Sequence, residues 1–125
     1  MKSNAFYDVE KNVERIVELI LDKKGEDIVV LDLREISSVA DFFIVVSGNS
    51  GVHVRAIADE LREKLKKDDK IMPWHVEGIQ SQKWILIDYV DIVVHVFDYE
   101  SREYYSIEKL WKDAESREIG ADPQV

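Results

Sequence analysis

The segment from Phe42 to Val46 (FFIVV) is apolar at every position. Alternate residues of a β-strand face opposite sides of the sheet, so a strand of this composition needs cover on both faces. Apolar residues at helical spacing predict an amphipathic helix on each side of it in the sequence, at about 6 to 23 and about 52 to 67. We therefore expect an α/β fold in which 42–46 is a central strand.

The rest of the chain completes this pattern. Strands are expected at 27–33, 71–76, 83–88 and 91–97, and a last amphipathic helical segment at about 101–113. Pro73 lacks a hydrogen-bond donor, which suits an edge strand. The prediction is one domain, 1–115, with a mixed sheet of about five strands and flanking helices, followed by a polar, flexible tail at 116–125.

The composition excludes several classes of function. The 125 residues carry 17 basic and 26 acidic side chains, a net charge of −9, and the basic residues at 62–70 are interleaved with acidic ones, so little direct contact with nucleic acid is expected. No cysteine is present, which excludes disulfides, thiolate catalysis and thiolate metal sites. Neither a signal peptide nor a membrane span is evident, so a cytoplasmic location is expected.

A turn-rich segment after the FFIVV strand resembles an anion site. Ser47, Gly48, Asn49 and Ser50 precede the second helix, and free amide groups at a helix start attract phosphate. The segment lacks the lysine of a P-loop and the third glycine of a dinucleotide fingerprint. Turn and cap chemistry, with Ser50 as the N-cap, is the preferred interpretation, and these four residues are secondary candidates for a binding site.

Catalytic and metal-binding patterns are weak. Asp88 and Asp91 could bring oxygen ligands to magnesium in a nucleotidyltransferase-like enzyme, but they flank a predicted turn. His53, His75 and His95 have no metal-ligand spacing, and His95 is expected in the core or half-buried, bonded to a neighbour, with a pH switch as the alternative. No nucleophile elbow occurs. We expect neither an enzyme nor a cofactor.

The stretch from Trp84 to Trp111 places charged residues where an apolar pattern would continue. Asp88, Tyr89, Val90 and Asp91 join two strongly apolar strands. Anions and an aromatic ring at such a turn cost free energy unless they are solvated or engaged by a partner. The pattern indicates a binding surface.

Three segments together resemble the Iojap-like ribosomal silencing factors. They are ADFFIVVSGNSGVHVRAIAD (40–59), WILIDYVDIVVHVFDYESREYY (84–105) and IEKLW (107–111). The resemblance covers about residues 8–114. It implies a fold similar to nucleotidyltransferases without catalysis. It also implies a translation repressor that binds the large ribosomal subunit through its fourteenth ribosomal protein and prevents subunit joining.

The same resemblance implies a contact surface at Trp84, Asp88, Tyr89 and Asp91. Family members usually have glycine where this chain has Val90, and a β-branched residue resists the positive φ of a tight hairpin. The loop is therefore expected to be wider or differently shaped, and Val90, a further candidate contact, departs from the family pattern.

The residue types agree with a protein partner. Tryptophan and tyrosine are enriched among binding hot spots, and aspartates suit a basic neighbour such as a ribosomal protein. Core packing is the alternative for Trp84. Self-association to a homodimer, through the edge at 71–76 or through the tryptophan surface, stays open.

Overall fold

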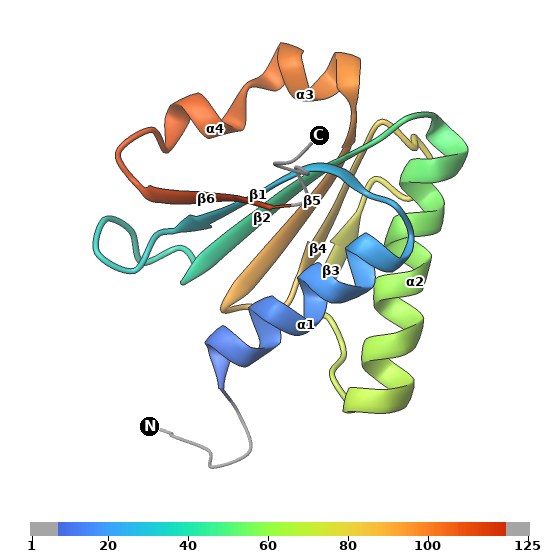
Figure 1. Ribbon diagram of the computed structural model, residues 1–125, viewed down its shortest axis with the longest axis horizontal. Coiled ribbons are helices and arrows are strands. Elements are labelled where there is room, and N and C mark those ends of the chain that lie inside the picture. The colour runs from blue at the N-terminus through green and yellow to red at the C-terminus, as the bar shows by residue number, and fades with distance from the viewer. Residues whose placement is uncertain (1–7, 120–125) are drawn as a thin grey trace, which may run out of the picture.

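The computed structural model describes residues 8–119 (Figure 1). The elements in chain order are α1 (Val9–Asp22), β1 (Glu26–Asp32), β2 (Phe42–Gly48), α2 (Gly51–Asp69), β3 (His75–Glu77), β4 (Trp84–Asp88), β5 (Ile92–Asp98), α3 (Tyr99–Tyr105), α4 (Ile107–Leu110) and β6 (Glu115–Ile119). The predicted α/β class is confirmed. The Phe6 end of the first predicted helix lies outside the described residues.

The strands form one mixed sheet in the order β3-β4-β5-β2-β1-β6. The β2–β5 pair is parallel and all other pairs are antiparallel. The expected count of five strands is wrong, because 115–119 forms a sixth strand paired with β1 instead of belonging to a tail. Residues 120–125 of the predicted tail lie outside the described part of the chain.

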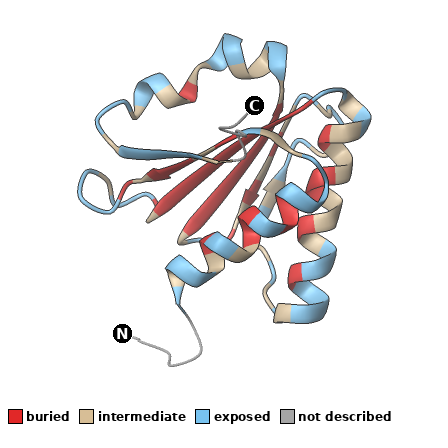
Figure 2. Cartoon of the chain, viewed as in Figure 1, coloured by how far each residue is buried: buried red, intermediate tan, exposed pale blue. Residues whose placement is uncertain are grey.

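The apolar strands occupy the middle of the sheet, as predicted. Every residue of β2 is buried, and β5 is buried from Ile92 to Phe97. Figure 2 shows that burial concentrates in these central strands and on the inward sides of α1 and α2. Because both faces of β2 are covered, a polar side chain there loses its solvation and needs a hydrogen-bond partner within the protein.

The sheet separates two hydrophobic clusters. On one face, α1 and α2 pack on the sheet through residues such as Ile16, Ile20, Ile57 and Leu61. The other cluster is smaller and includes Phe43, Phe97 and Ile107, with Ile107 contributed by α4. The second face is therefore covered by only two short helices and loops, and part of it stays accessible.

The helix termini follow their capping residues. Asp8 caps α1 by accepting from the backbone N–H of Glu10, and Ser50 caps α2 by accepting from that of His53, as predicted for Ser50. The α2 helix ends at Asp69, and its C-cap, Lys70, has a left-handed φ of 61°. These caps fix where the helices begin and end relative to the strands.

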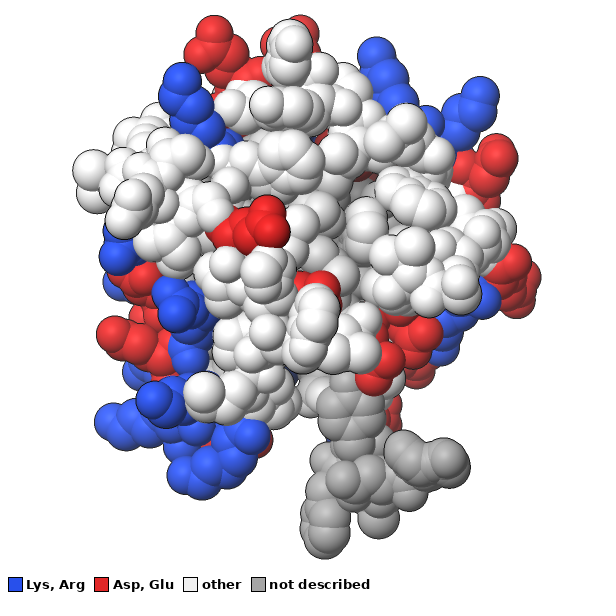
Figure 3. Space-filling view, turned by 180° about the vertical axis from the view of Figure 1, so that it is seen from behind, with Lys and Arg blue, Asp and Glu red and all other residues white. Residues whose placement is uncertain are grey.

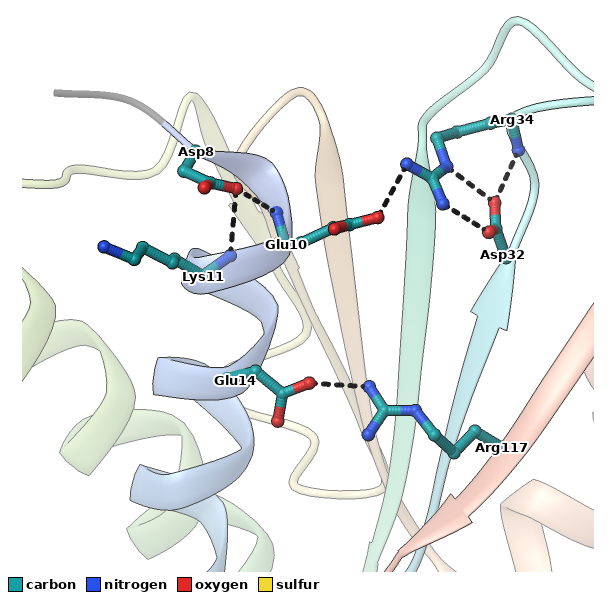
Figure 4. A network of polar contacts seen from close by, with 7 residues as sticks. All are labelled: Asp8, Glu10, Lys11, Glu14, Asp32, Arg34 and Arg117. Atoms are coloured by element: carbon teal, nitrogen blue, oxygen red, sulfur yellow. Dashed lines mark hydrogen bonds and ion pairs between the residues drawn. The ribbon is translucent and has the colours of Figure 1, made fainter. Parts of the chain in front are cut away.

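Ion pairs tie α1 to the β1–β6 edge of the sheet (Figure 4). Arg34 pairs with Glu10 at 3.0 Å and with Asp32 at 2.7 Å, and Arg117 of β6 pairs with Glu14 at 2.9 Å. Burial and the Arg34 contact act oppositely on Asp32, and the hydrogen bond from Arg34, the larger effect, lowers its pKa. The pairs are exposed, so they orient α1 and β6 more than they stabilise them.

Two predicted elements are divided or shortened. The strand expected at 71–76 is limited to His75–Glu77 and does lie at the sheet edge. The helical segment expected at 101–113 is two helices, because Ser106 takes a left-handed φ of 47° between them. A left-handed residue ends an α-helix, so the chain changes direction there. No helix within residues 8–119 is long and apolar enough to cross a membrane.

Candidate functional site

Trp84 begins β4 and is half-buried on the sheet face opposite to α1 and α2. Its ring stacks on Phe97 with centroids 4.9 Å apart, and its centroid lies 4.7 Å from that of Tyr105 in α3. Its indole N–H donates to Nδ1 of His95 at 3.1 Å. These contacts hold the indole in one orientation while leaving part of it accessible, so the core-packing interpretation holds for only part of the ring.

His95 is the buried polar partner of Trp84. Its side chain is 4% exposed, and burial lowers its pKa from 6.5 to about 4. Because Nδ1 accepts the hydrogen bond from Trp84, the neutral ring carries its proton on Nε2, and Nε2 has no protein partner. The prediction of a buried histidine bonded to a neighbour is confirmed.

The β4–β5 turn, Tyr89–Asp91, follows Asp88. An Asp88 carboxylate oxygen accepts from the backbone N–H of Val90 at 2.7 Å, and the N–H of Asp91 donates to the Tyr89 carbonyl at 3.0 Å. The Asp91 carbonyl accepts from the N–H groups of Asp41 and Phe42 at 2.8 and 3.0 Å, which ties the turn to the start of β2. The turn is therefore held on both sides.

Val90 lies at the tip of this turn with φ of 76° and 57% of its surface exposed. The expected resistance of valine to positive φ does not prevent that conformation. The Tyr89 N–H donates to the Ile92 carbonyl at 2.8 Å, so only Val90 and Asp91 lie between the last bonded residues, and the wider loop, one of the two expected alternatives, is not formed. Val90 takes the conformation in which glycine is usual. The strain of a β-branched residue there is of the order of 1–3 kcal/mol.

Tyr89 points to the other side of the sheet. Its side chain is 8% exposed and belongs to the cluster beneath α1 and α2. Burial raises its pKa to about 12, and its hydroxyl has no protein partner. Tyr89 thus offers little surface to a partner in this structure, whereas it anchors the turn in the core.

Carboxylates gather at this end of the sheet. Burial and the nearby Asp91 carboxylate raise the pKa of Asp41. Asp32 also raises the pKa of Asp41, and Arg34 lowers it. The turn is therefore an electronegative rim that favours a cationic neighbour.

Trp84, Leu86 and Asp88 share one side of β4, which we call the tryptophan face. Register pairs Trp84 with Phe97, Leu86 with His95 and Asp88 with Val93, and these β5 residues point to the same side. Trp84 and Asp88 stand at opposite ends of the strand, about 13 Å apart. Of the predicted site residues, Trp84 and Asp88 therefore share this face at its two ends, whereas Tyr89 lies on the other side of the sheet.

Figure 3 views the molecule from the side opposite to α1. Uncharged side chains cover much of this side, with a few acidic groups among them, and Lys and Arg gather toward the margins. Large hydrophobic side chains are exposed at several points in the fold: Trp74, Val90, Tyr104, Tyr105 and Leu110. Sequence reasoning did not single out Leu86 or Trp74, although the alternation from Trp84 to Asp88 includes Leu86.

The secondary candidates, Ser47 to Ser50, have structural roles. Ser47 is fully buried and its hydroxyl accepts from the Arg102 guanidinium at 2.8 Å. Gly48 has no room for a Cβ, which would lie 2.9 Å from the Val54 backbone nitrogen. The Asn49 N–H donates to Nδ1 of His53 at 2.9 Å, and Ser50 is the α2 cap. The N–H groups of Asn49 and His53 are thus bonded within the chain, which supports the turn-and-cap interpretation.

Asp88 and Asp91 were the candidate magnesium ligands. Within the described residues, no group of three histidine, cysteine, aspartate or glutamate side chains has the arrangement to hold a metal ion. Asp88 instead accepts from the turn backbone.

Comparisons with known proteins give a consistent result. Residues 7–124 match the family described as "Ribosomal silencing factor during starvation". The ribosomal silencing factor of Halalkalibacterium halodurans is 45% identical over 82% of this chain and 87% of its own length, and that of Bacillus subtilis is 45% identical over 74% and 78%.

Solved structures resemble the fold over most of its length. A crystal structure of a protein from Chromobacterium violaceum matches with a TM-score of 0.82 and 32% identity, covering 92% of this chain and 95% of that one. A crystal structure from Bacillus halodurans matches with a TM-score of 0.73 and 41% identity, covering 82% and 94%. The nucleotidyltransferase-like description of the fold is not confirmed by these matches.

Proposed function

The chain belongs to the ribosomal silencing factor family, and we propose that it represses translation in the cytoplasm by binding the large ribosomal subunit through its fourteenth ribosomal protein. Occupying that protein prevents the small subunit from joining. The proposal needs no catalysis, because a bound body at the subunit boundary is itself the obstacle.

The observation that carries the proposal is the tryptophan face with the acidic rim at its end. Trp84 and Leu86 provide apolar area on a side of the sheet that α1 and α2 leave uncovered. Asp88 and Asp91 provide negative charge beside it. An apolar centre beside charges of one sign is the composition of a surface that docks a basic protein.

The structure also supports a pre-ordered contact. The Trp84 indole is already fixed by His95, Phe97 and Tyr105, so binding would cost little side-chain entropy. A buried tryptophan at an interface centre contributes about 2 kcal/mol or more. Tyr89, being buried, would position the turn from below, while Val90 at the tip would touch the partner directly.

Co-sedimentation with purified large subunits, with and without the fourteenth protein, tests the proposal. The informative variant is Val90→Lys, because this exposed residue can gain a cation without loss of core packing. A cation facing a basic partner should weaken binding at least about tenfold. The matched control is Val52→Lys, at an exposed position in the first turn of α2.

Two outcomes would contradict the proposal. The wild-type protein could pellet equally with subunits that lack the fourteenth protein, or Val90→Lys could pellet like Val52→Lys. A magnesium-dependent nucleotide activity abolished by Asp88→Asn and Asp91→Asn would instead support the enzymatic alternative. Self-association through the β3 edge stays a prediction that a molar-mass measurement in solution would test.

A further inference from the structure

A groove lies at the β6 edge of the sheet, the edge opposite to β3. The α3–α4 segment passes over the β1–β6 end (Figure 1), and between them is a hollow of about 790 Å³. Its lining comes from the start of β1, from α3 and α4 and from the end of β6. β4 and β6 are four strand steps apart, about 19 Å, while α3 borders both places: it lines the groove and contacts Trp84 through Tyr105.

The groove opens onto an unpaired edge of the sheet. Of its apolar lining residues, Val29 packs with the cluster on the α3–α4 side, whereas Ile28 and Ile119 pack with the cluster beneath α1 and α2. Among residues 8–119, β6 pairs only with β1, so the main-chain groups on its outer edge have no strand partner within that range. An edge of this kind accepts an added strand, with affinity from main-chain hydrogen bonds and specificity from side-chain pockets.

The side chains around the groove are strongly acidic. Five carboxylates line the groove: Asp27, Glu100, Glu103, Glu108 and Glu118. The one guanidinium among the lining residues, that of Arg102, is already bonded to Glu108 at 2.9 and 3.1 Å and to Ser47. The other four carboxylates have no bond to this guanidinium. The groove is therefore negatively charged and favours a cationic ligand.

One end of the groove is closed by Tyr99. Its hydroxyl lies 2.6 Å from a carboxylate oxygen of Glu26 and 2.8 Å from one of Asp27, which connects α3 to the start of β1. The phenol has a single proton to donate to two carboxylates. The desolvation of Tyr99 and these two anions raise its pKa, so the closure stays in place in the range where carboxylates are charged.

We propose that this groove binds an extended, basic polypeptide segment of a protein partner, which adds to the edge of β6 and places Arg or Lys side chains among the carboxylates. Residues 120–125 of the chain itself carry one acidic side chain, Asp122, and no basic one, so charge disfavours them as the occupant. A nucleic acid is disfavoured by the same carboxylates. The proposal is independent of which protein the tryptophan face binds.

The experiment is a titration of the isotope-labelled protein with a peptide of about ten residues in which arginine alternates with valine, followed by NMR. The expected result is a shift of backbone amides in β6 and at Val29 and Tyr99, with binding that weakens as salt is raised. The same peptide with glutamate in place of arginine should not bind. Shifts confined to β4 and the β4–β5 turn, or no binding of the arginine peptide at low salt, would overturn the proposal.

A matched pair of variants tests the charges. The triple variant Glu100→Gln, Glu103→Gln and Glu118→Gln should bind the peptide about tenfold more weakly, since each exposed charge pair contributes modestly. The control, Glu35→Gln, Glu60→Gln and Glu63→Gln, changes the net charge equally but leaves the groove intact, and should bind normally. Equal weakening in both variants would reduce the effect to overall charge and overturn the site.

Two further measurements distinguish a polypeptide partner from a small polycation and from the chain's own C-terminal end. Spermidine carries positive charge but no main chain, so it should displace the peptide only at much higher concentration, and equal competition would overturn the assignment to a polypeptide. A variant that ends at Ile119 should bind the peptide with unchanged affinity. A tenfold gain in that variant would show that the chain's own end competes for the groove, and would likewise overturn the proposal.

Discussion

The imidazole of His95 lies between the rings of Phe43 and Trp84, with centroid distances of 4.6 and 6.0 Å. The unfolded chain takes up a proton on this residue near pH 6.5, whereas the folded protein does so only near pH 4. The contribution of neutral His95 to the free energy of unfolding is therefore complete above about pH 6.5. It is lost progressively as the pH falls toward 4, by about 3 kcal/mol in total.

Denaturant unfolding of the wild type and of His95→Asn at several pH values checks this prediction. Asparagine keeps an oxygen that can accept from the Trp84 indole and does not titrate. The variant should be less stable at pH 7 but should lose less stability between pH 6.5 and 4 than the wild type does. Equal pH dependence in the two proteins would assign the effect to other groups.

Val90 stores strain that a glycine would release. Val90→Gly should raise the free energy of unfolding by about 1 kcal/mol, because the exposed side chain gives up little packing and the positive φ becomes unstrained. The control Val52→Gly replaces another exposed valine, in the first turn of α2, and should destabilise by about 0.5 kcal/mol. A loss of stability in Val90→Gly as large as in the control would show that the turn is not strained.

At the scale of elements, a strand could be predicted where its own residues require burial on both faces of a sheet. Phe42–Val46 is apolar on both sides and was predicted as central for that reason. The strand at 115–119 (ESREI) has no alternation of apolar residues, and its only half-buried residue is Ile119. Its position depends on pairing with β1, which is a long-range contact that local sequence does not encode.

The β6 strand is therefore the element whose removal is most informative. A variant that ends at Ala114 should lose about 1–2 kcal/mol of stability, since little apolar area is buried by β6 but its ladder with β1 is lost. It should also associate more readily, because the edge of β1 becomes unpaired. Denaturant unfolding and light scattering measure both, with a variant that ends at Ile119 as the control.

The contrary result would be equal stability in these two variants. In that case the pairing of β6 with β1 would add nothing to the free energy of unfolding. The protein in solution would then behave as predicted from the sequence, with 116–125 as a polar tail.

At the scale of the whole molecule, the sequence gives the residues of the candidate site but not their arrangement. Trp84 and Tyr89 were predicted together, yet they lie on opposite sides of the sheet, one beside α3 and one beneath α1 and α2. Their odd spacing of five residues is a signal of this when the strand continues without a bulge. Tyr105 of α3 packs against Trp84 of β4. The contact joins two separate elements, so no local sequence pattern predicts it.

The charge of −9 acts on the molecule as a whole and should affect how fast the proposed partner is found. Opposite net charges attract over about a Debye length, which shrinks as salt is added. Raising salt from about 50 to about 200 mM should slow association with the isolated fourteenth ribosomal protein by about tenfold and change dissociation little. Rapid-mixing kinetics with Glu35→Gln, Glu60→Gln and Glu63→Gln, which lie outside the tryptophan face and the β4–β5 turn, should show a weaker dependence of association on salt. A salt effect confined to dissociation would instead place the electrostatic contribution within the bound interface, at Asp88 and Asp91.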